Sequence, residues 1–88
     1  MAPPRRRPMF WVYAIRSESR KDRVYIGQTY DLMRRVQAHN RGDVRSTEDD
    51  RPWTLIRFEE CATRSAARWL EKSLKQSRGR RVKWLSCA

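Results

Sequence analysis

Two short segments, FWVYAI at residues 10–15 and RVYIG at residues 23–27, set the architecture of this chain. Both are rich in aromatic and β-branched side chains, which are typical of β-strands. Residues 17–22, which separate them, are polar and turn-like. We therefore predict that the two segments pair as an antiparallel hairpin.

A helix is predicted to follow the hairpin. Thr29 is expected to cap its first turn, and Asp31 places a carboxylate near the positive end of the helix dipole. Gly42 is expected to end the helix, because glycine readily adopts the left-handed conformation found there. Three further residues lie at helical spacing between these ends: Leu32, Val36 and His39.

A third strand and a second helix are predicted downstream. A polar loop over residues 41–52 leads to a strand at residues 53–59. Thr63 is expected to cap a helix that runs to about Gln76, and Gly79 is expected to break it. The predicted apolar line of this helix consists of Ala66, Leu70 and Leu74, with Ala67 beside it. A short closing turn or helix is expected at Val82, Trp84 and Leu85.

This succession predicts an α+β fold, in which helices pack on a small antiparallel sheet in the order β-β-α-β-α with a short C-terminal helix. A chain of 88 residues is of single-domain size. We expect residues 1–8 to form an extended, disordered basic arm and residues 9–88 to form the domain.

The charge of the chain indicates its class of partner. It has 21 basic against 10 acidic residues, a net charge of +11, which favours a polyanion, either nucleic acid or an anionic membrane surface. The membrane is the weaker choice, because no apolar run approaches the roughly 20 residues of a spanning helix. A small ribosome-associated protein stays open on charge alone.

The two cysteines bear on localisation. Cys61 and Cys87 lie far apart and fit neither a metal-binding spacing nor a disulfide framework. We therefore expect reduced thiols in a cytoplasmic protein.

Several motifs resemble the GIY-YIG nuclease family. Trp11-Val12-Tyr13 and Tyr25-Ile26-Gly27 resemble its paired strand motifs, and residues 29–40 resemble its first helix. Three other stretches resemble its compact stand-alone branch, the URI-type predicted endonucleases: residues 45–47, 51–53 and 64–67. Residues 70–72 resemble the helix that bears the acidic residue of the family. The resemblance extends from Met9 to about Leu85.

The resemblance implies a three-stranded antiparallel sheet flanked by helices, and a metal-dependent phosphodiesterase. Water would be the nucleophile, Tyr13 the favoured base, and the products would carry a 5′-phosphate and a 3′-hydroxyl. Two departures stand out. Trp11 and Val12 replace the glycine and isoleucine of the first motif, and no asparagine follows Asn40, although several members carry a supporting asparagine after the metal-binding glutamate.

Glu71 is the candidate metal ligand, because it lies beside the predicted apolar line and can face a cleft. Mg²⁺ (or Mn²⁺) prefers oxygen ligands and is commonly held by one or two carboxylates. The alternative is a solvated glutamate that pairs with Arg68 or Lys75 at helical spacing.

The other catalytic candidates come from the predicted hairpin and the first helix. The hydroxyls of Tyr13 and Tyr25 can converge if their side chains share a face, and a tyrosine base needs nearby positive charge. Arg35 and His39 are four residues apart and share a helix face, where arginine can bind phosphate and histidine can shuttle a proton. The alternatives are core tyrosines with satisfied hydroxyls, a surface arginine and a buried helix histidine.

A second layer of residues is expected to position the nucleic acid. Gly27 permits a bulge or a close approach of chain or ligand, and Gln28 and Thr29 are expected to line the cleft. Trp53, Trp69 and Trp84 either stack on bases or, more commonly in a small domain, belong to the core. Phosphate contacts that do not read bases are expected from Arg34, Arg64, Arg68, Lys72, Lys75, Arg78, Arg80, Arg81 and Lys83.

The sequence thus predicts a divalent-metal-dependent endonuclease that hydrolyses DNA with low sequence specificity and serves repair or recombination. Its preference would come from nucleic-acid shape or from a partner protein. The alternative is a non-catalytic nucleic-acid-binding adaptor of the same fold. Joint retention of the five candidates favours the enzyme, because a binder would not need them all: Tyr13, Tyr25, Arg35, His39 and Glu71.

Overall fold

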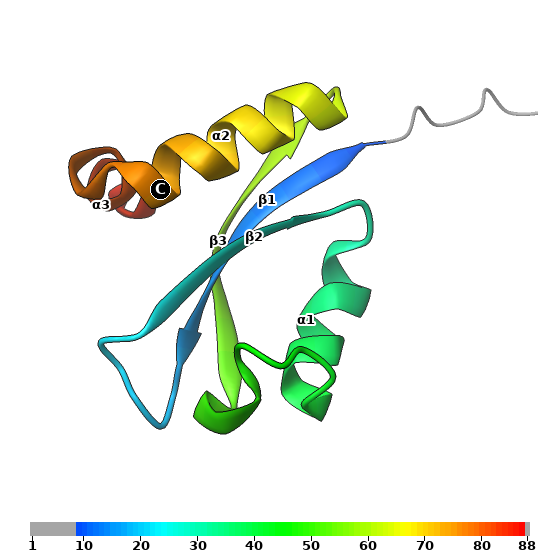
Figure 1. Ribbon diagram of the computed structural model, residues 1–88, viewed down its shortest axis with the longest axis vertical. Helices are drawn as coiled ribbons and strands as arrows, with labels where there is room; N and C mark the ends of the chain where they lie inside the picture. The colour runs from blue at the N-terminus through cyan, green and yellow to red at the C-terminus, as the bar shows by residue number, and fades with distance from the viewer. Residues whose placement is uncertain (1–8, 88) are drawn as a thin grey trace, which may run out of the picture.

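Strand β1 (Phe10–Ser17) lies at the centre of a three-stranded sheet and pairs antiparallel with β2 (Val24–Thr29) and with β3 (Trp53–Cys61) (Figure 1). The predicted hairpin and third strand are therefore confirmed. The structure is a computed structural model that describes residues 9–87, and the basic arm predicted for residues 1–8 lies outside the described residues.

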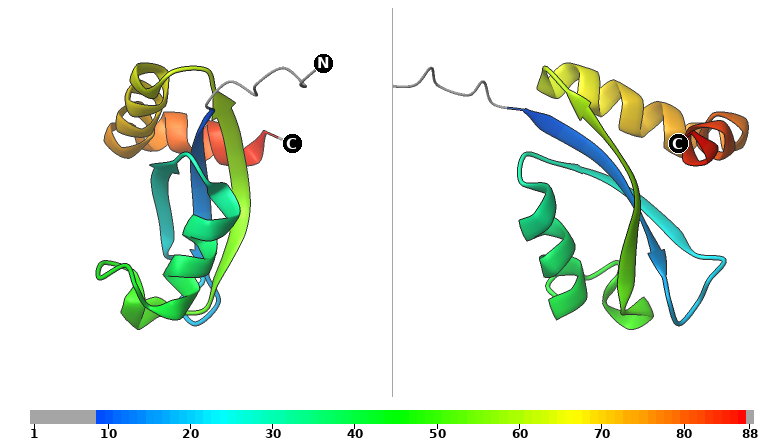
Figure 2. Two further views of the ribbon diagram at one scale, coloured as in Figure 1. Left: turned by 90° about the vertical axis from the view of Figure 1, so that its right-hand side faces the viewer. Right: turned by 180° about the vertical axis from the view of Figure 1, so that it is seen from behind.

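Helices cover both faces of this sheet. Helix α1 (Leu32–Arg41) packs on one face, and α2 (Arg64–Gln76) with α3 (Arg78–Ser86) packs on the other (Figure 2). A short 3-10 helix, η1 (Glu48–Asp50), lies within the loop that was predicted to be merely polar. The protein therefore has the predicted α+β fold, with the order β-β-α-β-α-α. No helix within residues 9–87 combines the length and the apolar composition needed to cross a membrane.

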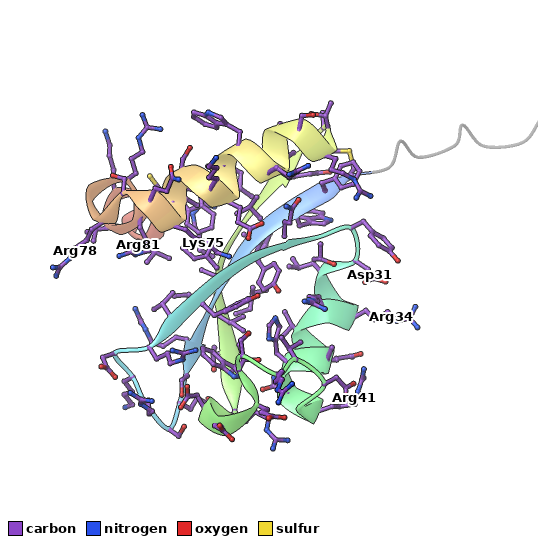
Figure 3. The ribbon with its side chains drawn as sticks, in the orientation of Figure 1. Asp31, Arg34, Arg41, Lys75, Arg78 and Arg81 are labelled. Carbon is purple, nitrogen blue, oxygen red and sulfur yellow. The ribbon has the colours of Figure 1, made fainter. Side chains whose placement is uncertain are left out.

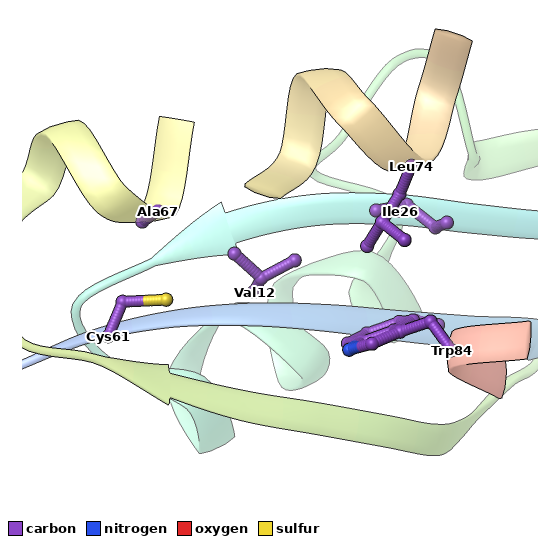
Figure 4. Packing of buried hydrophobic residues seen from close by; sticks show 7 residues of the cluster. Val12, Ile26, Cys61, Ala67, Leu74 and Trp84 are labelled. Atoms are coloured by element: carbon purple, nitrogen blue, oxygen red, sulfur yellow. The ribbon is translucent and has the colours of Figure 1, made fainter. Parts of the chain in front are cut away.

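The alternation of side chains along β1 divides the core in two. Val12 and Ala14 face α2 and α3, where they join a cluster that includes Leu74 and Trp84 (Figure 4). Tyr13 and the next residue on its face, Ile15, point to the opposite side and pack with residues of α1. This alternation follows from the period of two in a strand. It sends Tyr13, and not Val12, toward the first helix.

The start of α1 differs from the prediction. Asp31, and not Thr29, is the N-cap, since its side chain accepts a hydrogen bond from the Arg34 amide. Thr29 is the last residue of β2, too early to reach the first turn, and its hydroxyl instead accepts from the Asp31 amide. Gly42 ends the helix as predicted, in the left-handed conformation at φ 86°.

Two predictions for the C-terminal helices were wrong. The apolar face of α2 consists of Ala67, Leu70 and Leu74, so the prediction is confirmed at Leu70 and Leu74, whereas Ala66 is exposed and Ala67 takes its place in the core. Gly79 lies inside α3, and the break comes at Ser77. The Ser77 hydroxyl accepts from the Arg80 amide and so starts a new helix at the point where α2 ends. The Thr63 cap is confirmed.

Candidate active site

The side chain of Tyr13 lies across the backbone of Gly27. The two residues are partners in the β1–β2 register, and Tyr13 is fully buried. A Cβ atom added to Gly27 would lie 2.8 Å from the Tyr13 hydroxyl oxygen, which is closer than non-bonded atoms approach. The second strand motif therefore needs glycine so that the tyrosine of the first motif can cross it. The close approach predicted at Gly27 is confirmed.

The Tyr13 hydroxyl begins a chain of buried hydrogen bonds. Its oxygen lies 2.7 Å from Nε2 of His39, and Nδ1 of His39 lies 2.8 Å from the Thr47 hydroxyl oxygen. The Thr47 hydroxyl donates to the Val44 carbonyl at 3.2 Å, so it accepts from His39 and the histidine proton sits on Nδ1. Nε2 is then an acceptor, and Tyr13 donates to it.

Burial fixes the charge of this pair. It lowers the pKa of His39 to about 4, with a smaller contribution from the nearby Arg35 charge, so the imidazole is neutral at physiological pH. Burial also raises the pKa of Tyr13 to about 12, although the Arg35 hydrogen bond acts in the opposite direction. Tyr13 is therefore a phenol here, and it can serve as a base only by passing its own proton to His39.

Arg35 completes the group. It lies on α1 one turn before His39, and its Nε donates to the Tyr13 hydroxyl at 3.4 Å, which is long for such a bond. The predicted shared face of Arg35 and His39 is therefore confirmed. The neighbouring Arg34 points away from the sheet together with Arg41 (Figure 3), and both line an open hollow with Arg35.

Tyr25 joins the group through its ring. Its centroid lies 5.0 Å from that of His39 and 6.4 Å from that of Tyr13, so the two tyrosines share a face, which was the condition for their hydroxyls to converge. The Nζ atom of Lys75, on α2, lies 5.6 Å from the centre of the Tyr25 ring. Lys75 thereby bridges the tyrosine group and α2, and Figure 3 shows it between the helix and the strands.

Glu71 lies at the other end of this bridge. Its Oε2 is 2.7 Å from Lys75 Nζ, which confirms the pairing that the sequence left open, and its side chain is 19% exposed. The Glu71 charge contributes to the raised pKa of Tyr13, so the carboxylate is near enough to interact with the tyrosine group. Glu71 also lines a hollow of about 460 Å³, which Gln28 borders on the β2 side.

The side chains around Glu71 fit a weakly bound Mg²⁺ or Mn²⁺ ion better than a metal ion coordinated entirely by protein side chains. Within residues 9–87 no three His, Cys, Asp or Glu side chains gather as a metal site. Mg²⁺ nevertheless needs only one or two carboxylates, because water and substrate phosphate complete its octahedron. Glu71, at the wall of an open hollow with Oε1 unpaired among the described residues, offers that kind of ligand.

The other predicted basic residues divide into groups. Arg68, Lys72 and Lys75 line the hollow beside Glu71, and Arg64 borders a smaller hollow next to Gln28 and Thr29. Arg81 donates to the Leu74 carbonyl and so caps α2. Arg80 lies over the Trp69 ring, and Arg78 is exposed at the start of α3, away from the Tyr13 group (Figure 3).

Thr47 belongs to the stretch 45–47 that resembles the family, but the sequence indicated no role for it at the site. It lies in the loop before η1, is fully buried, and orients the imidazole of His39. The resemblance of residues 45–47 did not indicate which of the three contacts His39. Its importance arises from a contact across space, which no spacing along the chain reveals.

Comparison with protein families identifies the chain over most of its length. The model described as the GIY-YIG catalytic domain matches residues 9–83. Comparison with curated proteins finds no match, so the family model alone carries the assignment. The matched span contains all the residues of the hydrogen-bonded chain and Glu71.

The Gly27–Tyr13 contact predicts opposite effects for two Gly→Ala changes. Gly27→Ala should lower the free energy of unfolding by about 1–3 kcal/mol, because the added methyl forces Tyr13 from its site. Gly79→Ala is the matched control, since no atom lies within 4 Å of an added Cβ there. It should raise stability by roughly 0.5–1 kcal/mol, as alanine favours a helix. Urea unfolding measures both, and equal effects of the two changes would contradict this account.

The lowered pKa of His39 predicts a loss of stability in acid. Between pH 6.5 and about 4 the unfolded chain binds a proton at His39 that the folded chain does not, so stability falls as the pH drops through this window. We expect the His39 contribution to fall by about 2 kcal/mol from pH 7 to pH 5. His39→Gln, which does not titrate, should lack that part of the change in urea unfolding. An identical pH dependence in both proteins would show that His39 is not held neutral.

Proposed function

The chain belongs to the GIY-YIG catalytic domain family, a family of nucleases, and from this premise we propose that it is a divalent-metal-dependent endonuclease that hydrolyses phosphodiester bonds in DNA. Water is the nucleophile, and the products carry a 5′-phosphate and a 3′-hydroxyl. The observation that supports this most directly is the Tyr13 hydroxyl, held between an imidazole nitrogen that can accept a proton and the guanidinium of Arg35.

Tyr13 and His39 together act as the general base. As the attacking water forms its bond to phosphorus, it gives a proton to the Tyr13 oxygen, while Tyr13 passes its own proton to Nε2 of His39. The Nδ1–H···Thr47 hydrogen bond keeps Nε2 free for that transfer. The reverse tautomer would leave Tyr13 with no acceptor.

Access to the Tyr13 hydroxyl requires that Arg35 moves. Tyr13 is fully buried, so a water molecule reaches its oxygen only when a neighbour shifts. The long 3.4 Å bond from Arg35 is the weakest contact of the hydroxyl. We assign to Arg35 the role of turning to a phosphate oxygen, where its guanidinium binds the charge that grows during attack. Substrate phosphate would thereby expose the base.

Glu71 is the residue that would hold Mg²⁺ or Mn²⁺. A cation there supplies positive charge for the phosphoryl oxygens and for the leaving 3′-oxygen. Lys75 would have to release Oε2 or share the carboxylate, and its second neighbour, the ring of Tyr25, gives it an alternative position.

The basic side chains around these residues would contact phosphates rather than bases, which favours low sequence specificity. About six such contacts predict a salt slope near −5 for binding. A role in DNA repair or recombination, in the cytoplasm, follows as a proposal from the family and the charge. A partner protein would then supply further specificity.

A non-catalytic adaptor is the second candidate, and one observation favours it. Among the described residues, Glu71 is the only carboxylate that lines the hollow beside Gln28, and Lys75 already neutralises it. If that pair does not open, the fold binds nucleic acid through its basic surface and cuts nothing.

Nicking of supercoiled plasmid distinguishes these candidates. With Mg²⁺ or Mn²⁺ the wild-type protein should nick DNA, EDTA should stop it, and Glu71→Gln should slow it by at least about a hundredfold because the metal charge is lost. Glu60→Gln is the matched control, since Glu60 is exposed on β3. It should cut at the wild-type rate. Folded wild-type protein that binds DNA but cuts no substrate with either metal would favour the adaptor.

A further inference from the structure

Trp69 differs from the other two candidate tryptophans in its exposure. Trp53 and Trp84 belong to the core and are 3% and 8% exposed, whereas Trp69 is 63% exposed on α2. The guanidinium carbon of Arg80 lies over the Trp69 ring, 5.7 Å from its centroid. Single exposed apolar side chains are common on proteins. The position of Trp69 matters more, because it lines the same hollow as Glu71.

Tyr30 is a second exposed ring near the candidate site. It lies between β2 and α1, is 76% exposed, and borders two hollows. One hollow contains Arg34 and Arg35, and the other contains Arg64 and Gln28. Tyr30 therefore approaches the site from the side of α1, as Trp69 approaches it from α2.

The hollows adjoin one another. Gln28 borders both the hollow of Trp69 and one hollow of Tyr30, and Tyr30 connects that one to the hollow along α1. Seven basic and two acidic side chains line the three hollows. They form a cationic groove, which contains Glu71 and Trp69 in one hollow and Tyr30 in the other two. Figure 3 shows Lys75 on α2 and Arg34 on α1, the two helices that contribute to it.

We propose that Trp69 and Tyr30 stack on unpaired bases of a strand whose backbone follows this groove. The preferred substrate is then single-stranded DNA, free or as the arm of a branched structure. In a continuous duplex each base is stacked between its neighbours. The basic side chains of the groove would then contact the phosphates, but the rings of Trp69 and Tyr30 would find no free base. Unpaired bases offer a free face, and aromatic stacking with backbone cations is the general mode of single-strand binding. This inference rests on the proposed nuclease function.

Binding without metal tests the stacking separately from cleavage. Fluorescence anisotropy in EDTA would compare a labelled single strand, its duplex, and the same strand with abasic sites. Trp69→Ala and Tyr30→Ala should each weaken single-strand binding by about tenfold, within the range for loss of one stacked base, and duplex binding by less than about twofold. Val82→Ala is the matched control, since Val82 is 57% exposed on α3 and borders none of these hollows.

The abasic strand shows whether the rings meet bases. Wild-type protein should bind it about as weakly as Trp69→Ala binds the intact strand, and Trp69→Ala should lose little more on it. Unchanged single-strand binding by both variants, or equal losses on duplex, would overturn the proposal. So would sedimentation showing that Trp69→Ala abolishes self-association while DNA binding stays intact. Metal-dependent nicking could survive any of these results, so the nuclease proposal is judged independently.

Discussion

The rest of the site depends on the position of the Tyr13 hydroxyl. This hydroxyl is hydrogen-bonded to His39 and Arg35, and its position requires a residue without a side chain at Gly27. Tyr13 comes from the central strand, His39 and Arg35 from α1, and Gly27 from β2. A buried polar group that loses its partner costs free energy, so each of these elements is restricted by the others. The antiparallel pairing of β1 and β2 is what brings Gly27 under the ring.

The loop after α1 is held in place partly by the same group of residues, through the hydrogen bond between His39 and Thr47. Thr47 is held to His39, and three residues later Asp50, itself buried, pairs with Arg23 at 2.7 Å. Asn40 exchanges two hydrogen bonds with the backbone of Trp53, which ties α1 to the start of β3. The loop is therefore positioned at both ends and in the middle. A substitution there would reach Tyr13 through the imidazole, although it touches no substrate.

Patterns along the chain predicted the strands, the helices and most of the Tyr13 group, because strand alternation and helical spacing decide which side chains share a face. They placed Tyr13 with Tyr25 and Arg35 with His39. They were wrong at Thr29 and Gly79, where the caps of Asp31 and Ser77 set the helix ends, and at Ala66, where Ala67 is buried instead. Thr47 was noted only as part of a family-like stretch, and its contact with His39 was not predicted because it joins residues eight positions apart only in the folded chain. The role of Glu71 in metal binding stays a prediction, while its pairing with Lys75 is confirmed.

The tautomer and charge of the His39 ring decide whether Tyr13 has an acceptor for its proton. His39 is the only histidine of the chain, so nitrogen-15 NMR of its ring can be assigned without ambiguity. We expect a neutral ring with the proton on Nδ1 and a hydrogen-bonded, unprotonated Nε2, unchanged from pH 7 to pH 5.5. A proton on Nε2, or a charged imidazolium within that range, would contradict it, because Tyr13 would then have no acceptor for its proton.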